Sequence, residues 1–140
     1  MSKFAVPEML KGDRGSILII ASVQGLASQR NVLAHATSKH AMIDLTRCMA
    51  IDLAGRGRRV NCFCPGTVDT PMIQEIIKMD TGPRRLESAL NRMHPVGRNG
   101  QRQKNGEFVA FLASDRASFM SGSIVTVNGG SLVPNAGSPQ

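Results

Sequence analysis

The stretch GSILIIAS, residues 15–22, decides the fold class. It follows the turn-like segment KGDRG and is a short apolar run rich in isoleucine. A run of this length, bounded by turn residues and ended by polar side chains, is typical of a β-strand that is buried on both faces. Strands of that kind belong to parallel sheets covered by helices, so we expect the flanking segments to supply helices.

Helical and strand patterns alternate along the rest of the chain. Apolar side chains recur at three- and four-residue steps from about residue 34 to 54, as Met42, Leu45 and Met49 show, which predicts an amphipathic helix. We predict further strands at 59–64 and 123–130, shorter helices at 71–79, 82–93 and 105–114, and a polar loop at 23–33. Alternating strands and helices indicate parallel pairing through right-handed crossovers. The sequence therefore predicts an α/β fold with about three parallel strands.

The bulk properties favour one cytoplasmic domain. A length of 140 residues predicts a single domain over 1–140, with 129–140 as a loose tail. The net charge of +7 would suit a nucleic-acid partner, but the basic residues are scattered and the chain has no Trp or Tyr, so none is expected. The longest apolar run, at 17–20, is far too short to cross a bilayer, and residues 1–10 lack the core of a secretory signal. We expect no membrane association.

The cysteines do not suggest a metal site. They number three, and none has the spacing of a zinc site. Cys62 and Cys64 are two residues apart in VNCFCPG, so we expect both on one face of a strand. A C-x-C pair can bind a metal, but buried reduced thiols are the favoured interpretation.

Polar residues gather where the first two predicted strands end. Ser22 ends the first strand, and residues 65–70 follow the second. His35 and Lys39 are four residues apart at the start of the helix predicted at 34–54, so they share one helix face. Ligands of parallel α/β sheets bind beyond the carboxyl ends of the strands. The sequence therefore predicts a candidate active site at that edge of the sheet.

Four blocks of this chain resemble, in order, the C-terminal half of the short-chain dehydrogenase/reductase family. They are GSILIIASVQG, HATSKHAMIDLTRCMAIDLA, RVNCFCPGTVDTPM and FLASDRASFMSGSIVTVNGG. The resemblance covers nearly the whole chain. It implies the C-terminal part of a Rossmann-like doubly wound sheet with the N-terminal half absent. It also implies NAD(P)-dependent hydride transfer between small carbonyl and alcohol substrates.

The resemblance also implies roles for individual residues. Ser22 would hydrogen-bond the substrate oxygen, Lys39 would hold the nicotinamide ribose, and His35 would occupy the position of the family's tyrosine acid. The cofactor-binding residues would be Lys39, Pro65, Gly66, Val68 and Thr70, and the substrate would meet Gln24, Met72 and Ile73.

Two departures from the family pattern leave the function open. His35 interrupts the Y-x-x-x-K motif, and an imidazole reaches less far than a phenol. No glycine-rich G-x-x-x-G-x-G turn follows a strand in this chain, so most of the adenine and pyrophosphate site is not encoded in it, and the choice between NAD and NADP stays open. One function is an oxidoreductase that is impaired as this chain alone. The alternative is a non-catalytic remnant that associates with a full-length paralogue.

Four smaller expectations complete the prediction. Arg58 stands where the family usually has an apolar residue, and it is one of several small departures that together suggest relaxed constraint. We expect His94 to lie at the surface and Asp69 to cap the helix that begins at Pro71. The strand at 16–21 would expose an apolar edge, so we expect a homo-oligomer or pairing with a family paralogue.

Overall fold

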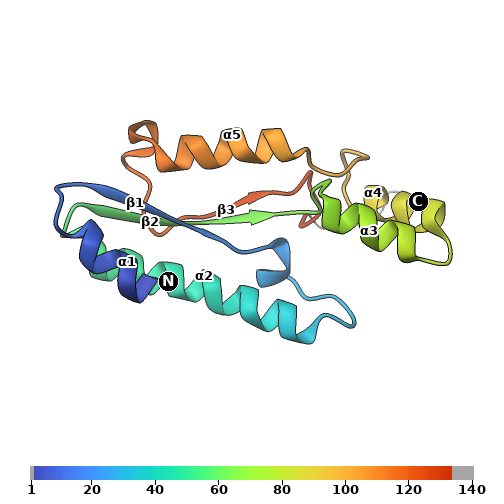
Figure 1. Ribbon diagram of the computed structural model, residues 1–140, viewed down its shortest axis with the longest axis horizontal. Coiled ribbons are helices and arrows are strands. Elements are labelled where there is room, and N and C mark those ends of the chain that lie inside the picture. Colours follow the sequence, from blue (N-terminus) through green and yellow to red (C-terminus); the bar gives the residue numbers. More distant parts are fainter. Residues whose placement is uncertain (1, 134–140) are drawn as a thin grey trace.

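The computed structural model describes residues 2–133 as three layers, with helices on both faces of a sheet (Figure 1). The strands are β1 (Gly15–Ile20), β2 (Arg58–Pro65) and β3 (Ile124–Val127). They are parallel and lie in the order β1-β2-β3. The α/β class and the three predicted strands are confirmed.

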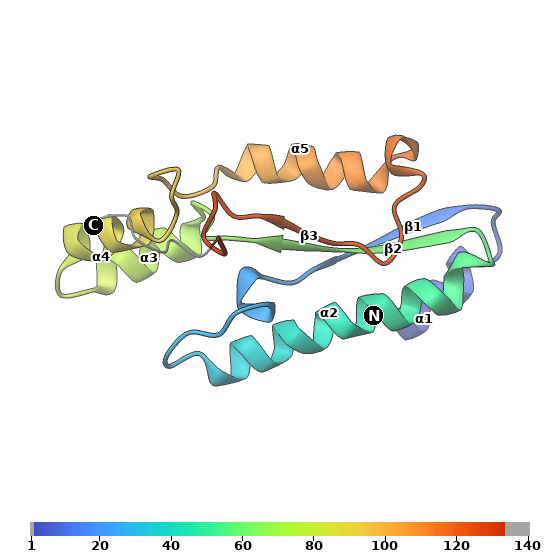
Figure 2. The ribbon, with the colours of Figure 1, turned by 180° about the vertical axis from the view of Figure 1, so that it is seen from behind.

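The helices divide between the two faces and one edge of the sheet. α1 (Ser2–Met9) and α2 (Leu33–Ala54) cover one face, and α5 (Arg102–Ala113) covers the other (Figures 1 and 2). α3 (Pro71–Met79) and α4 (Pro83–Arg92) lie beyond the carboxyl ends of the strands. Two short 3-10 helices, η1 (Val23–Gly25) and η2 (Asp115–Ala117), complete the described elements, so the predicted loop at 23–33 contains one helical turn.

The core lies on both sides of the central strand β2. Val60, Cys62 and Cys64 pack toward α2, whereas Phe63 packs against Leu112 on the opposite face. All four β2 side chains are buried, as expected for a strand between two helical layers. Parallel pairing of this strand on both sides therefore fixes where the loops after β1 and β2 emerge.

Arg58 has a structural role that corrects the interpretation of relaxed constraint. Its side chain is 3% exposed, and its guanidinium group donates hydrogen bonds to four backbone carbonyls. These acceptors are the carbonyl oxygens of Met9, Gly12, Asp13 and Arg56. The planar, always charged guanidinium suits this arrangement of several donors. Arg58 thus fixes the end of α1, which the sequence did not predict, to the start of β2.

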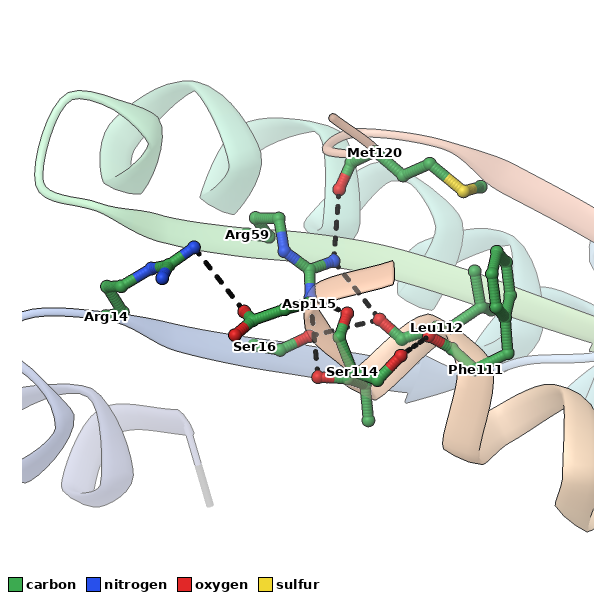
Figure 3. A network of polar contacts seen from close by, with 9 residues as sticks. Arg14, Ser16, Arg59, Phe111, Leu112, Ser114, Asp115 and Met120 are labelled. Atoms are coloured by element: carbon green, nitrogen blue, oxygen red, sulfur yellow. Dashed lines mark hydrogen bonds and ion pairs between the residues drawn. The ribbon is translucent and has the colours of Figure 1, made fainter. Parts of the chain in front are cut away.

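The neighbouring Arg59 performs a similar task on the other face of the sheet (Figure 3). Its guanidinium group donates to the carbonyl oxygens of Leu112 at 3.1 Å and Ser114 at 3.0 Å, and the Ser16 hydroxyl also donates to the Leu112 oxygen. Cationic side chains at a helix C-terminus satisfy the last free carbonyls and oppose the helix dipole. These contacts therefore join the amino edge of the sheet to the end of α5.

The predicted loose tail falls mostly beyond the described residues. Residues 129–133 form a turn after β3, in which the Val96 N–H donates to the Gly129 oxygen at 3.2 Å. Residues 134–140 lie outside the described part of the chain.

Candidate active site

The carboxyl edge of the sheet brings together the first predicted site residues. Ser22 follows β1 and is the N-cap of η1, where its hydroxyl accepts a hydrogen bond from the Gln24 N–H at 3.2 Å. The Lys39 ammonium group reaches over from α2 and donates to the carbonyl oxygen of Ile20, the last residue of β1, at 3.1 Å. The predicted convergence of β1 and α2 at this edge is confirmed.

Gly25 allows η1 to pack closely against α2. A Cβ atom at this position would lie 2.7 Å from both the Lys39 carbonyl oxygen and the Ile43 side chain. Contacts this short do not occur for real side chains, so the close approach requires glycine. The turn that carries Ser22 is therefore held against the turn of α2 that carries Lys39.

His35 lies one helical turn before Lys39 and is exposed. Its backbone oxygen accepts a hydrogen bond from the Ser38 hydroxyl at 2.7 Å. Within residues 2–133 its imidazole makes no hydrogen bond, and no side chain caps this end of α2.

The loop after β2 presents two backbone donors to the same edge. Gly100 pairs with one side of this loop, because its N–H donates to the Thr67 oxygen and its oxygen accepts from the Asp69 N–H, both at 2.8 Å. Successive N–H groups of an extended chain point to opposite sides. The N–H groups of Val68 and Thr70 accordingly have no acceptor within residues 2–133.

The remaining loop residues have other partners. Pro65 ends β2, and the Gly66 N–H donates to the Val127 oxygen at 3.1 Å. The Thr70 hydroxyl accepts from the Ile73 N–H at 3.4 Å, so Thr70, and not the predicted Asp69, caps α3. The cap must be the residue directly before Pro71, since the backbone there is still extended.

The predicted substrate residues lie around this edge. Gln24 is half-buried in η1, and its Oε1 atom is buried without a partner in the described part of the chain. Met72 is 70% exposed in the first turn of α3, whereas Ile73 is half-buried. The structure thus gives the edge both polar and apolar side chains.

His94 is buried, which corrects the expectation of a surface residue. It is 3% exposed, and its imidazole lies between the backbone of Leu90 and the backbone of Thr67. Sequence reasoning missed it because its partner in the loop after β2, the backbone of Thr67, is distant in the sequence and is brought to the ring only by the fold.

The two β2 thiols form a pair beneath Lys39. Cys62 and Cys64 are buried and free, with their Sγ atoms 3.8 Å apart, which confirms the predicted shared face. The hydrogen bond from Cys64 lowers the pKa of Cys62 to about 7. The same hydrogen bond, and then burial, raise the pKa of Cys64 above its ordinary range. The positive charge of Lys39 lowers both values slightly.

A family model described as Enoyl-(Acyl carrier protein) reductase matches residues 1–131 of this chain. The chain belongs to the short-chain dehydrogenase/reductase family. It is 42% identical over 130 residues to 2-(S)-hydroxypropyl-CoM dehydrogenase 3 of Xanthobacter autotrophicus, an alignment that covers 92% of this chain and 51% of that protein. The chain thus spans about half the length of the curated relatives that it matches.

Solved structures of this family agree with the fold. The ligand-free aldohexose dehydrogenase of Thermoplasma acidophilum is 38% identical and superposes with a TM-score of 0.90, over 99% of this chain and 56% of that one. ElxO with NADP bound is 28% identical, with a TM-score of 0.86 over 95% of this chain and 52% of that one. Relatives in the short-chain dehydrogenase/reductase family therefore include a dinucleotide-bound protein.

The residues at the carboxyl edge fit one end of a nicotinamide dinucleotide. The N–H groups of Val68 and Thr70, which have no acceptor in the described part of the chain, are suitable donors to a carboxamide or a phosphate, and the Lys39 ammonium group suits ribose hydroxyls. The glycine-rich turn that holds a pyrophosphate does not occur in the chain. The fit therefore covers the nicotinamide end only.

None of the helices within residues 2–133 has both the length and the apolar character that a membrane span requires.

Proposed function

We propose that this chain carries the catalytic half of an NAD(P)-dependent oxidoreductase that transfers hydride between a small carbonyl and an alcohol. The observation that carries this proposal is the gathering of the Ser22 hydroxyl, the Lys39 ammonium group and the Val68 N–H, which has no acceptor within residues 2–133, at one edge of the sheet. We further propose that the 140-residue chain alone is catalytically impaired, because it lacks a glycine-rich pyrophosphate turn.

Each polar group has a distinct proposed task in carbonyl reduction. When bound, the nicotinamide supplies a hydride to the carbonyl carbon, and the oxygen must then gain a proton. Ser22 hydrogen-bonds that oxygen, and Lys39 holds the ribose. The backbone that receives the nicotinamide carboxamide and nearby phosphate is formed by Pro65, Gly66, Val68 and Thr70. Gln24, Met72 and Ile73 contact the substrate, and the unpartnered Gln24 Oε1 supports a polar contact there.

His35 is the proposed proton donor, in the position where the family has tyrosine. General acids contribute about 10²- to 10⁴-fold to such steps. The imidazole is exposed, and it is shorter than a phenol. We therefore expect weak catalysis with His35 and stronger catalysis with tyrosine.

An activity test supplies the missing half of the fold. The N-terminal half of the Thermoplasma aldohexose dehydrogenase, joined before Met1, gives a chimera whose NAD(P)H oxidation is measured with a panel of small carbonyls. We expect His35→Tyr to raise turnover about 100-fold. Ser22→Ala in the same background is the control and should abolish the gain. A folded chimera that binds NAD(P)H yet gains nothing from tyrosine would contradict the role of His35.

A binding test uses the chain as it is. Reduced nicotinamide mononucleotide contains only the part of the cofactor that this edge fits, so we expect it to shift the Val68 and Thr70 amide resonances with a Kd on the order of 1 mM. The variant Lys39→Met should weaken this effect. Calorimetry with NADH and NADPH should show no micromolar binding to the same chain. Micromolar binding of either dinucleotide would refute the proposal that the cofactor site is incomplete. Val68 and Thr70 amide resonances that do not shift would refute the proposed nicotinamide site.

The exposed face of α2 favours a second candidate function, association without catalysis. Leu33 and Ile51 are 85% and 81% exposed, and Leu45 is half exposed on the same helix. Within the described residues, β1 pairs only with β2, so its other edge is open. We propose that the chain forms a homo-oligomer or pairs with a full-length paralogue. A monomer in sedimentation experiments that unfolds cooperatively would contradict this proposal.

A further inference from the structure

The buried imidazole of His94 connects three segments at the carboxyl edge of the sheet. Its Nδ1 atom lies 2.9 Å from the carbonyl oxygen of Leu90, in α4. Its Nε2 atom lies 3.1 Å from the backbone nitrogen of Thr67, in the loop after β2. The third segment is the turn after β3, where a Cβ atom on Gly129 would lie 3.3 Å from the Cβ atom of His94.

These two partners define the protonation state of the ring. A carbonyl oxygen only accepts, so Nδ1 must carry the hydrogen that is donated to Leu90. A backbone N–H only donates, so Nε2 must offer a lone pair to Thr67. Both bonds exist together only in the neutral ring with its hydrogen on Nδ1.

Close packing keeps the loop against this ring. A Cβ atom on Gly66 would lie 2.8 Å from Nε2 of His94 and 3.1 Å from the Cα atom of Asn128. The glycine therefore lets the loop approach the imidazole closely enough for the next residue, Thr67, to donate to it.

His94 and Gly100 together hold the Thr67 backbone from both sides. Nε2 of His94 accepts from the Thr67 N–H, and the Gly100 N–H donates to the Thr67 oxygen. With the peptide groups on both sides of Thr67 fixed, the Val68 N–H cannot turn inward to find a partner. The Val68 N–H therefore has no acceptor among residues 2–133, because the backbone of Thr67 before it is held in place.

We propose that His94 is a positioning residue. As the neutral ring with its hydrogen on Nδ1, it fixes the backbone of Gly66 and Thr67 and so keeps the Val68 N–H available to the nicotinamide carboxamide. The last step of this inference rests on the proposed function. The hydrogen bond to the loop does not, and it is tested separately.

Nitrogen NMR of the unaltered chain tests the protonation state. At neutral pH we expect the His94 ring to show a protonated Nδ1 and an unprotonated Nε2. The opposite tautomer, or a doubly protonated ring, would overturn the proposal. This measurement needs no variant, so it stands even if a substitution prevents folding.

Amide hydrogen exchange of Thr67 tests the contact with matched variants. The Oε1 atom of His94→Gln can replace Nε2 as the acceptor, whereas His94→Asn is too short to reach Thr67 but can still donate to Leu90. We expect the asparagine variant to exchange the Thr67 amide about tenfold faster, which corresponds to the loss of one buried hydrogen bond. The glutamine variant should stay close to the unaltered chain. Equal exchange in both variants would overturn the proposal.

Titration with reduced nicotinamide mononucleotide tests the step toward the cofactor. We expect the asparagine variant to bind about tenfold more weakly than the glutamine variant, in line with the loosened loop. The positioning role would be overturned if the two variants bind reduced nicotinamide mononucleotide equally well although the Thr67 amide is protected only in the glutamine variant. If the unaltered chain itself does not respond, the proposed function fails, and the exchange data still decide whether His94 holds the loop.

Discussion

The two edges of the sheet use their polar groups in opposite ways. At the amino edge, Arg58 and Arg59 direct every described contact of their guanidinium groups to backbone carbonyls, which joins α1 and α5 to the strands. At the carboxyl edge, the Val68 and Thr70 N–H groups have no acceptor within residues 2–133. The polar groups of the amino edge stabilise the fold, whereas the backbone donors of the carboxyl edge stay available to a ligand.

This difference agrees with how buried and exposed polar groups contribute to stability. When a buried charged donor or its acceptors lose their partner, the loss of folding free energy is several times the net contribution of one hydrogen bond. Donors at the rim of an open edge can be satisfied by water until a ligand arrives. Substitutions at the amino edge should therefore change mainly the free energy of unfolding, whereas those at the carboxyl edge should change the local geometry.

The largest effect is expected from Arg58→Leu. The substitution removes the donors of four backbone carbonyls and frees the end of α1, so we expect the free energy of unfolding to fall by about 3 kcal/mol. Urea unfolding followed by circular dichroism, at one fixed protein concentration, measures the change.

Arg14→Leu provides the matched control on the same edge. Arg14 is 71% exposed, and its ion pair with Asp115 spans 3.5 Å (Figure 3). Exposed pairs of this kind contribute about 0–1 kcal/mol. If both leucine variants unfold at the same urea concentration, the amino edge does not depend on the buried arginine.

A smaller, pH-dependent effect on stability is expected from the thiol pair beneath Lys39. The pKa of Cys62 is lowered to about 7, against about 8.5 for a thiol in the unfolded chain. Between these values the folded chain binds fewer protons than the unfolded chain, so its stability rises with pH and is lost as pH falls through about 7. At higher pH the raised pKa of Cys64 reverses the trend, because the unfolded chain then loses a proton that the folded chain keeps.

The free energy of unfolding, measured between pH 6 and about pH 10, should accordingly have its maximum between the ionisation of folded Cys62 and that of folded Cys64. Cys64→Ala removes the donor of the hydrogen bond, so its stability should no longer rise above pH 7. Cys48→Ala is the control, since Cys48 is exposed, and it should leave the curve unchanged. An unchanged rise in Cys64→Ala would show that the pair does not share its proton as described.

The sequence predicted what depends on periodicity and on topology. The isoleucine run of β1 and the three- and four-residue steps of α2 reflect burial by whole elements, which a linear pattern records. The placement of Ser22 and Lys39 at one edge of the sheet followed from topology alone, because ligand-binding residues of parallel α/β folds gather beyond the carboxyl ends of the strands. These features needed no knowledge of individual contacts.

The features that the sequence did not predict depend on backbone atoms far away in the chain. Arg58 looks anomalous in the sequence, because no sequence pattern indicates that the carbonyl oxygens of Met9 and Gly12 are its acceptors. His94 lacks a signal for the same reason, although its place at the end of a predicted helix and directly before Pro95 could have suggested a capping role. A side chain that binds the backbone leaves no complementary residue in the sequence.

The smallest expected effect compares two glycines that receive the same methyl group. At Gly66 the new Cβ atom would lie 2.8 Å from Nε2 of His94 and 3.1 Å from the backbone of Asn128, so Gly66→Ala must displace the loop and should cost about 1–2 kcal/mol. At Gly106, inside α5, nothing lies within 4 Å, so Gly106→Ala should stabilise the chain by about 1 kcal/mol through helix propensity. Urea unfolding should therefore give shifts of opposite sign. Two stabilising substitutions would show that the loop after β2 is not packed on His94, and the carboxyl edge would then lack the ordered backbone that distinguishes it from open solvent-facing loops.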